Sequence, residues 1–240
     1  MKKLPALIII LFTATMLHAS YDEAVKLFQK TQYQAALKIV AEKLEVDKDM
    51  EPNSPNYKLR YLAAHLHWKL GNEKSVIAHF KRCMEIKKEA VNPYIDLALY
   101  LVEQKRYGDA EIYIKNGLKI RNDAMLYYLL GRIALERGNL GRAKALFEKT
   151  NTIDPEIYIS YNDLGITLMK LKKYGDANTA FSVALAIMPR SAELENNLGM
   201  SLEKMKKYNQ AYEHYRKANA IDMENKDILA NMVRMKKKIK

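Results

Sequence analysis

Histidine and cysteine are the residues of this chain best suited to metal binding or nucleophilic chemistry. His65 and His67 are only two residues apart, and on a helix this spacing puts two side chains on nearly opposite faces. They are therefore poorly placed to share a metal ion. His79 and His214 lie far apart along the chain. These residues do not indicate a metal site.

Sequence motifs that would indicate catalysis do not occur. The chain has no Gly-rich phosphate loop, nucleophile elbow, His-Glu-x-x-His motif or paired-cysteine spacing. Its acidic residues are scattered among lysines, as in DEAVKLFQK and EKMKK, which is typical of the exposed surface of helices. We therefore expect no enzymatic activity, no metal or other cofactor, no small-molecule substrate and no nucleic-acid ligand.

The N-terminus reads MKKLPALIIILFTATMLHAS, with Lys2 and Lys3 before an apolar run that leads to Ala19 and Ser20. This order is typical of a secretory signal peptide. The apolar run is shorter than the roughly 20 residues that a membrane span needs. We predict that residues 1–20 are a cleaved signal peptide. The alternative is an uncleaved segment that anchors the chain in the inner membrane.

The composition places the basic charge unevenly. The net charge is +12, and residues 226–240 alone contribute six basic residues against Asp227. The single cysteine, Cys83, excludes an internal disulfide, so the fold must depend on its apolar core. A chain of this length can bury such a core.

The tetrapeptide YGDA occurs at residues 107–110 and again at 174–177. Around both copies, pairs of small and apolar residues recur at nearly constant steps of about 34 residues. The pairs are Ala63 and Ala64, Leu97 and Ala98, Leu130 and Gly131, Leu164 and Gly165, and Leu198 and Gly199. Within each unit the apolar spacings are three, four and seven, which predicts two amphipathic helices per unit and an all-α fold.

The period of about 34 residues, the leucine–glycine pair, a tyrosine that opens the second helix, and closing prolines at 155 and 189 resemble the tetratricopeptide repeat (TPR) pattern. The resemblance covers residues 57–225 as five repeats, which start near Tyr57, Val91, Ala124, Tyr158 and Ala192. It implies a right-handed superhelical solenoid of helix-turn-helix repeats. Residues 21–46 are expected to form a divergent helix pair, residues 47–56 a loop, and residues 226–240 a basic capping helix.

The turn inside each repeat departs from this family in part. Gly71 and Gly138 keep the glycine that is frequent there, whereas Lys105, Lys172 and Lys206 replace it. We expect the lysines to suit the negative end of the preceding helix. Cys83 stands at a position for a small side chain and is expected to be buried and unreactive.

The resemblance implies that one stripe of each first helix lines a concave groove that binds a protein or peptide segment. At about 100° per residue, this stripe lies roughly 130° from the leucine–glycine pair. It comprises Tyr61, His65, Trp68, Ile95, Leu99, Val102, Tyr128, Arg132, Leu135, Asn162, Ile166, Met169, Asn196, Met200 and Glu203. Trp68 and Tyr128 are the predicted anchors. In the alternative interpretation, these side chains pack on the first helix of the next repeat.

In the C-terminal segment, Ile228, Met232, Met235 and Ile239 form an apolar stripe that is expected to cover the last repeat. Arg234, Lys236, Lys237, Lys238 and Lys240 are expected to face water and to allow contact with an anionic surface.

These features favour a non-enzymatic adaptor, scaffold or assembly factor that acts in the periplasm of a bacterial cell envelope. The alternatives are a basic protein that binds an anionic polymer or phospholipid, and a structural subunit of an envelope complex. The sequence does not indicate the oligomeric state.

Overall fold

The computed structural model describes residues 19–46 and 56–239. Most of the predicted signal peptide and of the predicted loop at 47–56 lies outside the described residues. The part of the chain that is described consists of helices joined by short turns and contains no strand. The all-α prediction is therefore confirmed.

The chain divides into two units, Met1–Arg121 and Asn122–Lys240. In the first unit, a helical segment at residues 19–29 precedes five helices. These are α2 (Tyr33–Val46), α3 (Asn56–Lys69), α4 (Glu73–Ile86), α5 (Asn92–Glu103) and α6 (Tyr107–Ile120). The helices of the second unit are α7 (Ala124–Glu136), α8 (Leu140–Ile153), α9 (Tyr158–Lys170), α10 (Tyr174–Ile187), α11 (Ala192–Lys204), α12 (Tyr208–Ile221) and α13 (Lys226–Lys238).

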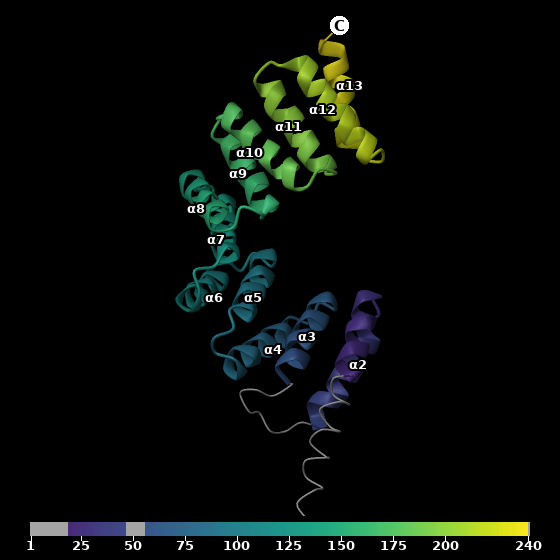
Figure 1. Ribbon diagram of the computed structural model, residues 1–240, viewed down its shortest axis with the longest axis vertical. Coiled ribbons are helices and arrows are strands. Elements are labelled where there is room, and N and C mark those ends of the chain that lie inside the picture. The colour runs from purple at the N-terminus through teal and green to yellow at the C-terminus, as the bar shows by residue number, and fades with distance from the viewer. Residues whose placement is uncertain (1–18, 47–55, 240) are drawn as a thin grey trace, which may run out of the picture. The chain divides into compact units, whose positions relative to one another are not determined.

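Within each unit, helices pack in the order of the chain (Figure 1). In the first unit α3 packs on α4 and α5 on α6, while α4 also contacts α5. In the second unit the pairs are α7 with α8, α9 with α10, and α11 with α12, and each second helix also contacts the next first helix. The last helix, α13, packs on α12. This is the predicted helix-turn-helix repeat arrangement with a C-terminal capping helix.

Close contact inside a pair depends on a glycine that faces an aromatic ring. Gly131 faces Phe147, Gly165 faces Phe181, and Gly199 faces Tyr215. A Cβ atom at Gly131 would lie 2.6 Å from the Phe147 ring, which is closer than Cβ atoms approach in proteins. All three rings are buried. The glycine thus lets the two helices approach while the ring fills the space between them.

The turn within each helix pair contains one residue with a positive φ. The φ angles are 59° at Thr31, 74° at Gly71, 58° at Lys105, 74° at Gly138, 60° at Lys172 and 63° at Lys206. Glycine suits this left-handed conformation because it lacks a Cβ atom. The positive φ explains why glycine is frequent at this position. Lys105, Lys172 and Lys206 adopt the same conformation despite their side chains.

The repeated YGDA tetrapeptide has the same place in both units. Tyr107 is the first residue of α6 and Tyr174 is the first residue of α10. An aspartate follows in the first turn of each helix, where it faces the positive end of the helix dipole. The alanines at 110 and 177 are fully buried.

Candidate functional site

Polar side chains join successive first helices in the first unit. Tyr61 Oη donates a hydrogen bond to Asp96. His65 Nε2 lies 3.2 Å from the same carboxylate. Trp68 Nε1 donates to Glu103 Oε2 at 3.2 Å. These partners are 31 or 35 residues apart, whereas equivalent positions in successive repeats are about 34 residues apart. Each contact therefore joins a residue of α3 to a residue of α5 that lies one position after, or about one helical turn before, the equivalent position.

The same spacing recurs in the second unit. Tyr128 Oη donates to Asp163 Oδ2 at 3.1 Å, and Arg132 Nε lies 3.7 Å from the same oxygen atom. Three amide contacts continue the series. These are Asn162 Nδ2 to Glu193 Oε1 at 3.0 Å, Asn197 Nδ2 to Asn162 Oδ1 at 2.9 Å, and Asn231 Nδ2 to Asn196 Oδ1 at 3.0 Å. We call these contacts between first helices the polar ladder of each unit.

Several side chains predicted to line the groove are engaged in the polar ladder or are buried. Tyr128 is 4% exposed and Val102 is 5% exposed. Trp68 is partly buried, stacks on His65 and meets the Tyr100 ring edge-on. For Tyr61, His65, Tyr128 and Arg132, the contacts are those of the alternative interpretation, in which the side chain packs on the next first helix.

Other side chains of the predicted stripe remain accessible. Ile95 and Leu99 are partly exposed in the first unit. Leu135, Ile166 and Met169 are partly exposed in the second unit, and Met200 is 40% exposed. We call the accessible set the apolar stripe of each unit: Ile95 and Leu99 in the first, and Leu135, Ile166, Met169 and Met200 in the second. It offers apolar contact area beside polar groups that are already paired.

Burial affects three ionisable groups of the polar ladders, those of Tyr61, Tyr128 and Asp163. Burial raises the pKa of Asp163 to about 6, although Arg132 and the hydrogen bond from Tyr128 act in the opposite direction. Burial, together with the adjacent aspartate, also raises the pKa of the Tyr61 and Tyr128 phenols. These tyrosines therefore stay protonated at neutral pH and act as hydrogen-bond donors.

The predicted basic tail is only partly free to face water. Arg234 forms an ion pair with Glu203 on α11, and Lys238 Nζ lies 3.2 Å from the same carboxylate. Burial raises the pKa of Glu203, but hydrogen bonds from Arg234, Lys238 and Tyr215 lower it overall. Arg234 is exposed, as expected, but it also pairs with the preceding repeat, which was not predicted. Lys236 and Lys237 are exposed, and Lys240 lies outside the described residues.

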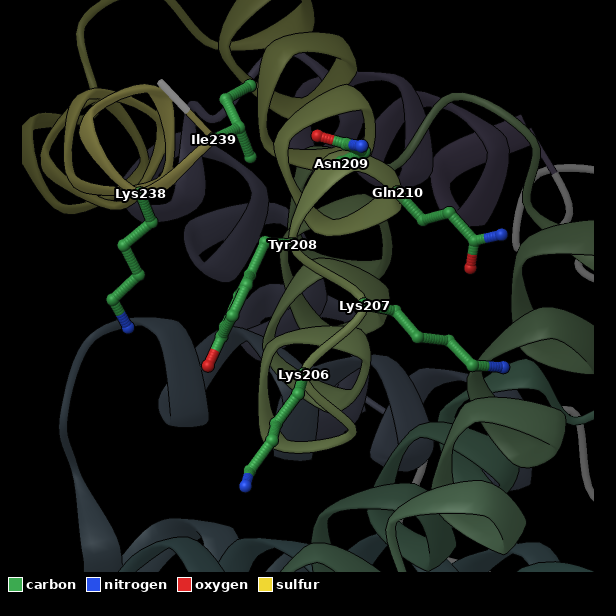
Figure 2. A pocket seen from close by; sticks show the side chains of 7 residues that line it. All are labelled: Lys206, Lys207, Tyr208, Asn209, Gln210, Lys238 and Ile239. Carbon is green, nitrogen blue, oxygen red and sulfur yellow. The ribbon is translucent and has the colours of Figure 1, made fainter.

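An open depression lies where α12 begins (Figure 2). It is lined by Lys206, Lys207, Tyr208, Asn209, Gln210, Lys238 and Ile239. Lys206 and Tyr208 point toward the side on which Lys238 lies, whereas Lys207 and Gln210 point away from it. The Lys238 Nζ atom lies 5.1 Å from the centre of the Tyr208 ring. The depression can attract an anion, but its cations are surface side chains.

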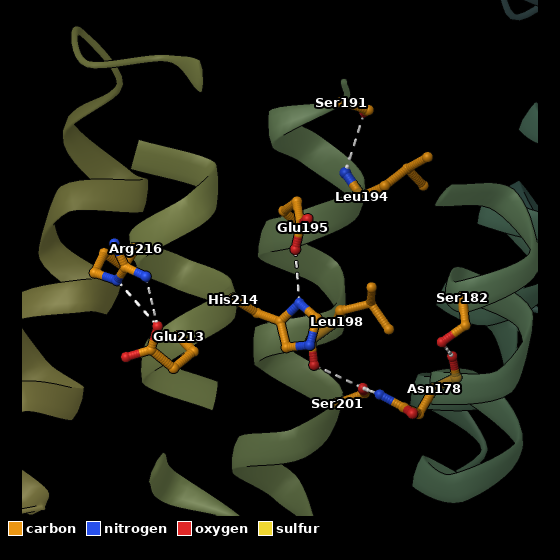
Figure 3. Close-up of polar contacts among 10 residues, drawn as sticks. All are labelled: Asn178, Ser182, Ser191, Leu194, Glu195, Leu198, Ser201, Glu213, His214 and Arg216. Atoms are coloured by element: carbon orange, nitrogen blue, oxygen red, sulfur yellow. Dashed lines mark hydrogen bonds and ion pairs between the residues drawn. The ribbon is translucent and has the colours of Figure 1, made fainter. Parts of the chain in front are cut away.

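A partly buried histidine–carboxylate pair in the last repeat was not predicted. Figure 3 shows His214 on α12 pointing at Glu195 on α11, with 2.6 Å between Nδ1 and Oε2. Asn178 on α10 donates to Ser201 Oγ on α11 at 2.8 Å. The sequence contains one signal that could have indicated this pair. The three middle repeats carry a tyrosine at the position equivalent to Glu195, at residues 94, 127 and 161, so the glutamate departs from the repeat pattern.

Within the described part of the chain, the histidines and Cys83 do not gather at one site. His65 faces Asp96, whereas the His67 ring stacks on His79 on the other side of α3. Cys83 is buried as predicted, and burial raises the pKa of its thiol to about 12. Among the described residues, no group of three or more His, Cys, Asp or Glu side chains could hold a metal ion.

Crossing a lipid bilayer demands both length and apolar character of a helix. Within residues 19–46 and 56–239, none of the helices meets both requirements.

The ordered helix pairs, the glycine–aromatic contacts and the polar ladders define a helical repeat protein. The tetratricopeptide repeat family model matches residues 57–89, 125–157 and 192–225. These are the first, third and fifth of the predicted repeats. The chain therefore contains tetratricopeptide repeats, and arrays of this repeat are protein–protein interaction modules or scaffolds.

Solved structures of similar fold include PilW, described as a widely conserved type IV pilus biogenesis factor. It has a TM-score of 0.74 and 14% identity, with 90% of this chain and 97% of PilW covered. PilF of Pseudomonas aeruginosa has a TM-score of 0.73 and 13% identity, with 94% and 99% covered.

The Cut9 chain of the APC/C Cut9–Hcn1 hetero-tetramer has a TM-score of 0.75 and 15% identity, and this chain spans only 42% of its length. A sequence comparison with curated proteins gave no match. At these identities the structural likeness shows the fold alone.

Proposed function

We propose that this protein is a non-enzymatic assembly factor or adaptor that binds an apolar segment of a partner protein along the apolar stripe of its first helices. The observation that carries the proposal is the exposure of Met169 and Met200 beside ladder residues whose polar groups are already paired. Flexible methionine side chains adapt to the shape of a bound segment. The polar groups at the border are already paired, so a bound apolar segment does not have to supply hydrogen-bond partners for them.

The periplasm of a bacterial cell envelope is the location that we propose. The support is the signal-like order of residues 1–20 in the sequence. PilW and PilF match this chain over nearly their whole length, and PilW is a pilus biogenesis factor. This likeness supports an assembly role only by analogy of fold.

A general role in binding anionic polymers is less well supported. Arg234 and Lys238, two of the basic residues on which that alternative depends, are paired with Glu203. Pairing within the protein reduces the positive charge that they offer to a ligand.

The test is recovery of partners from the periplasmic fraction of the native host by chemical cross-linking and mass spectrometry. The variant Met169→Glu/Met200→Glu places charges on the apolar stripe of the second unit. The matched control is Ile112→Glu, which changes an apolar side chain that is 57% exposed on the second helix α6. We expect the double variant to lose the cross-linked partner and the control to retain it. Equal recovery by all three folded proteins would contradict the proposal.

A further inference from the structure

The last helix has the register of the first helix of a further repeat. It begins at Lys226, one repeat length after Ala192 begins α11. In the preceding repeat, the second helix α12 covers one face of α11, where Tyr215 packs on Gly199 and His214 pairs with Glu195. A shift by one repeat length places Val233 at the position of Gly199 and Leu229 at the position of Glu195. These are the positions on α13 that a second helix would cover.

Both positions on α13 carry exposed apolar side chains. Leu229 is 41% exposed and Val233 is 42% exposed. Met223, in the preceding turn, is 75% exposed and occupies the position of Pro189, which lines the depression next to His214. The opposite side of α13 is used inside the protein, where Ile228 and Met235 are buried. The exposed side is therefore not needed to hold the helix on α12.

The charged side chains of α13 nearest to Leu229 and Val233 are of one sign, whereas Met223 in the preceding turn lies between Asp222 and Glu224. Lys226, Lys236 and Lys237 are exposed, and at about 100° per residue they lie within roughly 80° of Leu229 around the helix axis. Asp227, the acidic residue of α13, lies roughly 160° away from Leu229. We call Met223, Leu229, Val233, Lys226, Lys236 and Lys237 the α13 face.

We propose that the α13 face is a second interaction surface, distinct from the apolar stripe, and that it binds an acidic amphipathic α-helix of a partner protein. The partner helix takes the place that α12 has on α11 and runs antiparallel to α13. Its apolar side covers Met223, Leu229 and Val233, and acidic residues on its borders meet the three lysines. Complementary charge of this kind contributes both orientation and association rate.

The residue at position 233 also restricts the partner helix. A Cβ atom at the equivalent Gly199 would lie 2.7 Å from the Tyr215 ring. Val233 has a branched side chain there, so an aromatic ring in the partner helix cannot approach as Tyr215 does. The partner helix must place a small side chain opposite Val233. A second copy of this chain is a poor occupant, because each copy carries a net charge of +12.

The experiment uses the protein with residues 21–240 in full and three synthetic peptides of about 18 residues, a length at which a helix can form on binding. The first peptide has a Leu and Ala stripe bordered by Glu, the second carries Lys in place of Glu, and the third has the composition of the first in scrambled order. Binding is measured by fluorescence anisotropy at low and at high salt. We expect the first peptide to bind at least 10-fold more tightly than the other two, and more weakly as salt rises.

Two variants test the surface itself. Lys236→Glu/Lys237→Glu and Leu229→Ser/Val233→Ser should each weaken binding of the first peptide at least 10-fold, and circular dichroism should show that both remain folded. The matched control is Lys170→Glu/Lys173→Glu, which reverses two exposed lysines on α9 and in the following turn. It should leave binding unchanged. The stripe variant Met169→Glu/Met200→Glu should also leave it unchanged, so failure of this inference is distinguishable from failure of the proposed function.

Several results would overturn the inference. The first is equal binding of all three peptides, or no binding of the acidic peptide at 1 mM. A second is that the parent protein binds vesicles of anionic phospholipid but does not bind the acidic peptide, and that Lys236→Glu/Lys237→Glu abolishes the vesicle binding. This result would assign the face to a membrane surface. A third is a concentration-dependent dimer, detected by light scattering, that Leu229→Ser/Val233→Ser abolishes.

Discussion

Tyr128 donates a hydrogen bond at 3.1 Å to Asp163, which lies 35 residues further along the chain on the next first helix. The aspartate is mostly buried, and burial raises its pKa from the ordinary 3.8 to about 6. The polar ladder of the second unit therefore contains a carboxylate whose charge is disfavoured by its surroundings. Its effect on stability must depend on pH.

Asp163 should make the second unit less stable as the pH rises. The folded protein binds this proton more tightly than the unfolded chain, so the stabilising contribution is present below about pH 4 and is lost as the pH rises through 6. Asp163→Asn keeps an acceptor for Tyr128 and removes the titration. Between pH 4.5 and pH 7, the free energy of opening α9 should fall by about 2 kcal/mol more in the parent than in the variant. Native-state hydrogen exchange measures it, and identical pH slopes would contradict the assignment.

His79 should have the opposite effect in the first unit. Burial, with smaller contributions from His67 and Arg60, lowers its pKa from 6.5 to about 4. The folded protein disfavours the protonated form of His79. The contribution of this residue to stability is therefore fully present above pH 6.5 and is lost as the pH falls toward 4. His79→Gln should therefore reduce the acid destabilisation of α4 by about 1–2 kcal/mol at pH 5. Hydrogen exchange of α4 amides at pH 5 and pH 7 checks this, and an unaltered loss in the variant would exclude His79 as its source.

The glycine that faces an aromatic ring should not tolerate a methyl group. Gly165→Ala places a Cβ atom well inside contact distance of the Phe181 ring, so the ring or the helix must move, at a cost of about 1–3 kcal/mol in stability. Gly175→Ala is the matched control, because nothing lies within 4 Å of the added atom. The control should be neutral or more stable by up to about 1 kcal/mol, since alanine favours a helix. Urea unfolding followed by circular dichroism compares them, and equal midpoints would refute close contact.

The buried and exposed sides of α13 should differ in their sensitivity to substitution. Met235 is fully buried in a cluster with Leu202, Ala211 and Tyr215. Met235→Ala should lower the free energy of unfolding by about 2–4 kcal/mol through the lost burial and the cavity left behind. Val233→Ala, on the exposed face, should change it by less than about 0.5 kcal/mol. Thermal unfolding of both variants tests the packing, and a Met235→Ala protein that melts like the parent would show that α13 is not docked.

The sequence was sufficient to predict the repeated helix pairs, because their determinants are local and periodic. Gly165 and Phe181 belong to the same repeat, and a glycine and an aromatic residue appear with the same spacing at 199 and 215. The contacts between repeats were harder to predict. Whether Tyr128 faces a partner or Asp163 depends on the rotation of one first helix against the next, which composition does not specify. The ion pair of Arg234 was not predicted for the same reason, since its partner Glu203 is 31 residues away.

The turn residues were identified from the sequence, but their backbone conformation was not. Only the charge of the lysines at 105, 172 and 206 was considered from the sequence, whereas the structure shows that the backbone there is left-handed. Side-chain charge can be read from a sequence, but a positive φ at a lysine cannot, because glycine alone signals that conformation strongly.

Each polar ladder contact joins only two adjacent first helices, so the stability of a repeat depends mainly on its immediate neighbours. A substitution in α11 should therefore disturb α9 and α13 but have little effect on α7. In the second unit, opening should begin at the last helix, α13, which packs on α12, and proceed inward repeat by repeat. A ligand that spans two repeats would couple their opening, and its presence would then be detectable as cooperativity even at positions that it does not touch.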